Sequence, residues 1–159
     1  MTARQLADLI DTYAPALVLF ARQWCAAPED VVQDAFCKLA SQAAVPDDPV
    51  AWLYRVTRNA AIDTGKAERR RSRREAVVAR SVRWFDESAI DGLDAGAAVA
   101  ALEDLPADER EVIVARLWGG MTLAQIAVVT VCSVSTAHRR YEAGLAALRE
   151  RLGVICPKT

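Results

Sequence analysis

Apolar residues recur every three or four positions along most of this 159-residue chain, and few stretches alternate with period two. The first apolar stripe consists of Leu6, Leu9, Ile10, Tyr13, Leu17, Phe20 and Trp24. This spacing places one side of a helix in a core, whereas a half-buried strand requires alternation. Hydrophobic residues make up 53% of the sequence, which is enough to fill real cores. The pattern therefore predicts an all-α protein.

Two further helical stretches follow the first in the N-terminal part of the chain. One begins at Pro28, followed by two acidic residues that suit the first turn of a helix. The other spans residues 48–74, with Asp48 as its predicted cap and a proline at the first helical position. Because the connections are short, we expect a three-helix bundle within a domain over residues 1–80.

The C-terminal part predicts a second helical domain. Between residues 81 and 96 the helical period fades, and two glycines with several acidic residues indicate a linker. Residues 97–153 then predict a four-helix domain. Within it, a capping box beginning at Thr122 starts a short helix, and a longer helix begins at Val134 after a tight turn. This pair fits a helix-turn-helix, although other helical hairpins share the pattern. The stripe predicted to be buried on the longer helix is Val134, Ala137, Tyr141, Leu145, Leu148 and Leu152.

The stretch 48–74 also carries a polar face at helical spacing. Its members are an aromatic, an amide and cations, namely Trp52, Arg55, Asn59, Lys66, Arg70 and Arg73. Aromatic rings stack on unpaired bases, amides recognise base edges, and cations neutralise phosphates. A helix whose basic end is merely solvated is the alternative, and this stretch alone does not decide between them. The net charge of −1 argues against strong nonspecific DNA binding by the free protein.

Several classes of protein and site are disfavoured by the composition. The only histidine is His138, and the cysteines lack metal-site spacing at Cys25, Cys37, Cys132 and Cys156. We therefore expect no metal and no cofactor, and mostly buried, reduced thiols in a cytoplasmic protein. No signal peptide and no apolar run of about 20 residues is seen, so membrane insertion is not expected. An enzyme is the least favoured class, since no nucleophile elbow or phosphate-cradling glycine loop occurs.

Three blocks of sequence, in order, resemble a bacterial extracytoplasmic-function (ECF) RNA polymerase sigma factor of the sigma-70 family. They are EDVVQDAFCKLA, then AWLYRVTRNAAID, then ALEDLPADEREVIVARLWGGMTLAQIA followed by STAHRRYEAGLAALRERL. The resemblance covers residues 6–152. It implies a first domain that melts the minus-ten promoter element and a second that binds the minus-thirty-five element through its helix-turn-helix. It also implies core RNA polymerase, promoter DNA and an anti-sigma factor as partners.

The resemblance assigns roles to individual residues. It places Asp30, Gln33, Asp34 and Lys38 on a polymerase-binding helix, where Phe36 is better assigned to the core. The residues assigned to the minus-ten element are Trp52, Arg55, Arg58, Asn59, Asp63, Lys66 and Arg70. Among these, Asn59 matches the position that lines the pocket for a flipped base, and Trp52 remains equally open to a role in the core. The residues assigned to the minus-thirty-five element are Ser135, Thr136, His138, Arg139 and Arg140.

The sequence departs from the family pattern at two places, and other functions remain open. Thr130-Val131-Cys132 stands where the helix-turn-helix usually has a glycine, and Glu142 is acidic where relatives often carry further arginines. One alternative is a helix-turn-helix regulator of the response-regulator type, although the first half lacks strand–helix alternation. Another is a sigma-like decoy that binds regulators and not DNA. Redox sensing by Cys37 or Cys132 is also open, but buried inert thiols are favoured.

Overall fold

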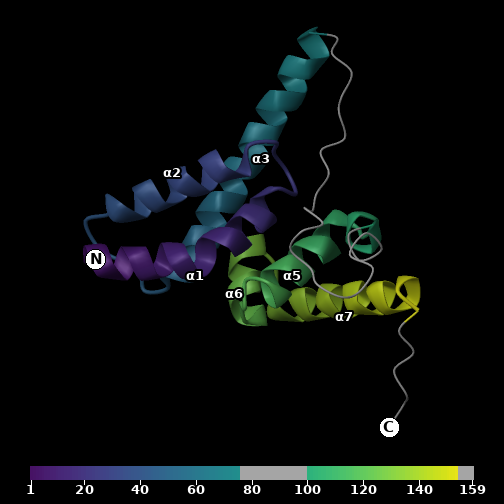
Figure 1. The fold of residues 1–159 in the computed structure, drawn as a ribbon. Helices are drawn as coiled ribbons and strands as arrows, with labels where there is room; N and C mark the ends of the chain where they lie inside the picture. Colours follow the sequence, from purple (N-terminus) through teal and green to yellow (C-terminus); the bar gives the residue numbers. More distant parts are fainter. Residues whose placement is uncertain (76–99, 154–159) are drawn as a thin grey trace.

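A computed structural model of the chain describes residues 1–75 and 100–153 (Figure 1). Its helices are α1 (Ala3–Ala21), α2 (Pro28–Ala40), α3 (Pro49–Glu75), α5 (Ala107–Leu117), α6 (Leu123–Thr130) and α7 (Val134–Arg151). Residues 100–103 are also helical, and the described residues contain no strand. The predicted all-α fold is therefore confirmed. The predicted linker over residues 81–96 lies outside the described residues.

Helix starts follow the capping residues in the sequence. The backbone N–H of Ala51 donates to Asp48 Oδ1 at 2.9 Å, so Asp48 caps α3 as predicted. Thr122 and Gln125 form the predicted capping box at the start of α6, each satisfying a backbone N–H of the other. These caps fix where α3 and α6 begin, and therefore which side chains each helix presents.

The N-terminal half, residues 1–75, packs α1, α2 and α3 against one another (Figure 1). Its largest fully buried side chains are Leu17, Phe20, Leu39, Leu53 and Tyr54. The rings of Phe20 and Tyr54 meet edge to face, with centroids 5.0 Å apart. Trp24 was predicted within the first helix, but α1 ends at Ala21. The chain turns back after that end, so the Trp24 ring still packs against Phe20, at 5.1 Å.

The C-terminal half, residues 100–153, is built around a second set of buried side chains. They are Val112, Ile113, Val114, Met121, Ile126 and Val129. In α7, Gly144 allows close packing on α5, since a Cβ there would lie 2.9 Å from Ile113 Cγ1. The predicted buried stripe of α7 is wrong at its two ends, where Val134 is 52% and Leu152 is 40% exposed. Of the stripe, Ala137 is buried, and Tyr141, Leu145 and Leu148 are half-buried and pack against the core.

The two halves pack against each other and share a continuous core. Helix α3 contacts α6, and α1 contacts α5 (Figure 1). The halves approach closely at Gly119, where an added Cβ would lie 2.4 Å from the Tyr54 hydroxyl oxygen. A side chain at position 119 would therefore force the halves apart locally.

Two kinds of feature are absent from the described residues, 1–75 and 100–153. No helix placed there is long and apolar enough to cross a membrane. No group of three or more His, Cys, Asp or Glu side chains in these ranges is arranged to hold a metal ion.

Candidate nucleic-acid interfaces

One side of α3 presents polar and charged side chains to solvent. The exposed residues at spacings of three and four are Arg55, Asn59, Asp63, Lys66 and Arg70. Such spacing places them along one side of the helix. Asp63 and Lys66 form an exposed ion pair at 3.7 Å, which contributes little to stability. The structure therefore leaves the Asn59 amide and several cations accessible on one surface.

Trp52 lies at the start of the same helix but is only half-buried. Its side chain packs against the hydrophobic core while part of it remains accessible. This placement is compatible with both interpretations of the residue, as core and as a stacking surface for a base. Its role at the minus-ten element stays a prediction.

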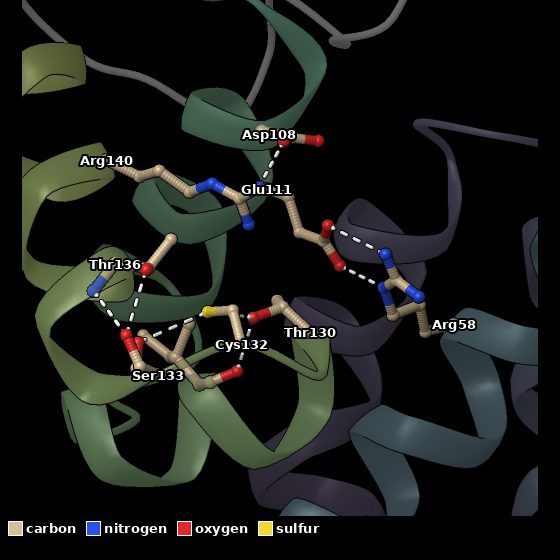
Figure 2. A network of polar contacts seen from close by, with 9 residues as sticks. Arg58, Asp108, Glu111, Thr130, Cys132, Ser133, Thr136 and Arg140 are labelled. Carbon is tan, nitrogen blue, oxygen red and sulfur yellow. Dashed lines mark hydrogen bonds and ion pairs between the residues drawn. The ribbon is translucent and has the colours of Figure 1, made fainter.

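Arg58 points away from the exposed side of α3 and toward the C-terminal half (Figure 2). Its Nε and Nη2 both donate to the carboxylate of Glu111, the second at 3.2 Å. The guanidinium carbon also lies 5.9 Å from the centroid of the Trp24 ring, within range of a cation–π interaction. While the two halves are packed together, which we call the closed arrangement, the Arg58 guanidinium is therefore engaged by other residues of the chain.

Glu111 is a buried acid, with only 3% of its side chain exposed. Burial raises the pKa of Glu111, and the hydrogen bonds and charge of Arg58 act in the opposite direction. Glu111 was not among the residues predicted from the sequence. A signal was present, because Glu111 directly precedes the apolar run of residues 112–115, and a carboxylate in such a place needs a partner.

A second polar contact joins the halves through the two helix caps. Gln125 Nε2 donates to Asp48 Oδ2 at 2.8 Å, while Gln125 Oε1 accepts from the backbone N–H of Thr122. The backbone N–H of Ala51 lowers the pKa of Asp48, and the Gln125 amide adds to this effect against the cost of burial. The start of α3 is thus tied to the start of α6 across the interface.

The predicted polymerase-binding residues lie on the outer side of α2. Asp30, Gln33, Asp34 and Lys38 are all exposed, and Phe36 is buried as expected. Beside them runs an apolar pocket between α1 and α2, lined in part by Ile10, Val32 and Phe36. Cys37 lines the same pocket and is exposed, so the expectation of a buried thiol is wrong at this position. It lies on the solvent side of α2, next to Lys38, while Cys25 is buried.

The turn of the helix-turn-helix is held by a local polar network (Figure 2). The Thr130 hydroxyl donates to the Ile126 carbonyl at 2.9 Å and lies 3.1 Å from Cys132 Sγ. Ser133 then caps α7, its hydroxyl accepting from the Thr136 backbone N–H at 3.1 Å. Val131 takes the left-handed conformation that a glycine usually supplies, with φ 54°. This conformation costs a β-branched residue about 1–2 kcal/mol.

The residues predicted to read the minus-thirty-five element divide into two sets on α7. Ser135, His138 and Arg139 are exposed. Thr136 is half-buried, and Arg140 turns back to form an ion pair with Asp108 at the start of α5 (Figure 2). The Arg140 side chain is 26% exposed. Ser135, His138 and Arg139 are therefore accessible on the surface, whereas Arg140 is paired with another residue of the same half.

Comparison with known proteins agrees with this two-part organisation. The sequence matches the family described as sigma-70 region 2 over residues 9–75, and sigma-70, region 4 over residues 95–148. The comparison with curated proteins returned no match.

Two solved structures are similar over nearly the whole chain. One is the sigma factor RpoE in complex with the anti-sigma factor NepR from Bartonella quintana, with TM-score 0.72 and 25% identity. That match covers 97% of this chain and 100% of the other. The other is CnrH in complex with the cytosolic domain of CnrY, with TM-score 0.65 and 26% identity, covering 98% of this chain and 92% of the other.

The two helical halves, the helix-turn-helix and the matches to both regions define a factor of bacterial transcription initiation. The chain belongs to the sigma-70 family. Within that family it is an RNA polymerase sigma factor of the ECF type, as the resemblance in the sequence implied.

Proposed function

We propose that this sigma factor binds its partners through three separate surfaces. The outer side of α2 binds core RNA polymerase, the Asn59 side of α3 binds the melted minus-ten strand, and α7 binds the minus-thirty-five duplex. The observation that carries the proposal is the simultaneous exposure of the two nucleic-acid surfaces, with Asn59 on one half and Arg139 on the other. Domains over residues 1–80 and 97–153, joined by residues 81–96, remain the proposed boundaries.

Promoter melting on this scheme needs no covalent chemistry by the chain. Unstacking a base costs a few kcal/mol, and binding of the extruded base in a protein pocket offsets that cost. The Asn59 amide offers both a donor and an acceptor to a base edge. The nearby cations on α3 offer charge for the backbone of the separated strand.

The closed packing of the halves bears on how these surfaces become available. Arg58 belongs to the set assigned to the minus-ten element, yet it is paired with Glu111 from the other half. We infer that the halves separate when polymerase places them on two different promoter elements, and that this separation releases Arg58. Such a chain acts where core polymerase is, in the cytoplasm.

An anti-sigma factor is the further partner that the comparisons favour. Both similar structures are complexes with a second protein, named an anti-sigma factor in the case of NepR. This chain is similar to RpoE over 97% of its length, including both halves. We propose that a comparable protein holds this chain in its closed arrangement.

Transcription from purified components tests the proposal. Core RNA polymerase, with or without this chain, is supplied with genomic fragments from the organism that encodes it, and transcript start sites are mapped. We expect new start sites that share two upstream sequence elements. Absence of both core binding and promoter-directed transcripts would contradict the proposal. Binding to an anti-sigma factor without binding to core polymerase would instead identify a sigma-like decoy.

A further inference from the structure

Three valines on the helix-turn-helix are exposed to solvent. Val128 on α6 is 59% exposed, Val131 in the turn is 84% exposed, and Val134 at the first position of α7 is 52% exposed. The start of α7 is fixed by the Ser133 cap, so the direction of the Val134 side chain is set by the fold. Val134 was predicted to be buried, and the family resemblance assigned it no role.

The exposed residues near Val134 are of the types that contact DNA. His138 lies one helical turn along the same side of α7, and Arg139 lies one turn beyond Ser135; all three are exposed. At the far end of this side stands Glu142, whose carboxylate disfavours close approach of a phosphate. The distribution of charge therefore favours closest contact with a duplex over the first two turns of α7, where Val134 lies.

We propose that Val134 is a specificity-determining residue that contacts the C5-methyl group of a thymine in the minus-thirty-five element. The inference rests on the proposed function, in which α7 enters the major groove. Thymine is the base that presents a methyl group there, whereas the other bases present donors and acceptors. A valine side chain cannot hydrogen-bond to polar groups, so it favours the base whose edge carries a methyl group. The Arg140 guanidinium is paired with Asp108, so the contact proposed for Val134 does not depend on it.

The test uses the holoenzyme formed by this chain and core RNA polymerase. A duplex library randomised upstream of the melted region is first selected for binding. Each thymine in the selected upstream element is then replaced by deoxyuridine, which removes only the methyl group. Affinity is measured for the unchanged chain and for Val134→Ala, a substitution that suits an exposed helical position. Val128→Ala is the matched control, since Val128 is similarly exposed but lies on α6.

We expect one uracil replacement to weaken binding by the unchanged chain by about fourfold, the value of one buried methyl group. Val134→Ala should be insensitive to that same replacement, and Val128→Ala should respond as the unchanged chain does. If Val134→Ala and the unchanged chain respond equally to replacement at every thymine, the inference is overturned. A selected element without thymine would also overturn it. Neither result would affect the proposed function. If Val134→Ala binds DNA as the unchanged chain does but no longer binds an anti-sigma factor, the surface around Val134 binds protein. That result would also overturn the inference. If no duplex is selected at all, the proposed function fails as well.

Discussion

Each half of the molecule contains two neighbouring polar residues that point in opposite directions. On α3, Asn59 faces solvent while Arg58 turns inward to Glu111. On α7, Arg139 faces solvent while Arg140 turns back to Asp108. Both arginines form an ion pair within the chain, but the acidic partners lie in different places. Glu111 belongs to the opposite half from Arg58, whereas Asp108 and Arg140 lie within the same half.

This difference determines what a separation of the halves would change. Separation breaks the Arg58–Glu111 pair and exposes an arginine beside the Asn59 surface. It leaves the Arg140–Asp108 pair intact, so the surface of α7 is the same in the closed and the separated states. The minus-ten surface is therefore expected to depend on the arrangement of the halves, and the minus-thirty-five surface is not.

The largest effect is expected from Arg58→Ala in the free chain. The substitution leaves Glu111 buried without its partner, which costs about 3–5 kcal/mol in comparable buried pairs. We expect the closed arrangement to loosen, seen as a larger radius of gyration by X-ray scattering and a lower urea midpoint. Adding Glu111→Gln to Arg58→Ala should recover part of the loss. An unchanged radius and midpoint in Arg58→Ala would show that the pair does not hold the halves together.

Asn59→Ala is expected to affect melting and not assembly. Lost hydrogen bonds to an unpaired base should cost about 1–3 kcal/mol in the open complex. Permanganate reactivity of melted thymines measures this step, and affinity for core polymerase is measured in parallel. Arg149→Ala, at an exposed position near the end of α7, is the control. An equal fall in core affinity would make Asn59 a structural residue.

Arg139→Ala and Arg140→Ala form a matched pair on α7. We expect Arg139→Ala to weaken binding to the promoter duplex by about 1–3 kcal/mol if Arg139 contacts a base. Arg140→Ala removes a partly exposed ion pair within one half, which contributes at most about 1 kcal/mol to stability, and should leave duplex affinity nearly unchanged. Equilibrium binding of the holoenzyme to a duplex promoter measures both. A larger loss from Arg140→Ala would reverse the assignment.

The smallest effect is expected from Val131→Gly in the turn. Glycine removes the cost of the left-handed conformation but adds freedom to the unfolded chain, so the net gain in unfolding free energy is about 0.5–1 kcal/mol. Since Val131 is 84% exposed, the gain should be the same in the Arg58→Ala background. Urea unfolding measures both. A gain that disappears in that background would mean that the turn is coupled to the interface.

Local features of the fold could be predicted from the sequence because their causes are local. Asp48 and Thr122 cap their helices as expected, and apolar periodicity identified the helices. The exposure of Asn59 and Arg139 follows from the same periodicity. Where a stripe runs past its packing partner, as at Val134, periodicity alone could not locate the edge of the core.

Contacts between the halves could not be predicted in the same way. Arg58 and Glu111 are 53 positions apart, and Asp48 and Gln125 are 77 apart, so no short-range pattern links them. The exposed position of Cys37 was missed for a related reason. Cysteine is usually buried, and only the packing of α1 on α2 shows which side of the helix faces solvent.

We infer that the two halves are packed together in the free chain and separate when core polymerase binds. Fluorescent labels at two exposed positions, Asp8 on α1 and Arg149 on α7, report the distance between the halves by energy transfer. We expect efficient energy transfer in the free chain and a marked fall when core RNA polymerase is added. Inefficient transfer in the free chain, or no change on polymerase binding, would contradict it.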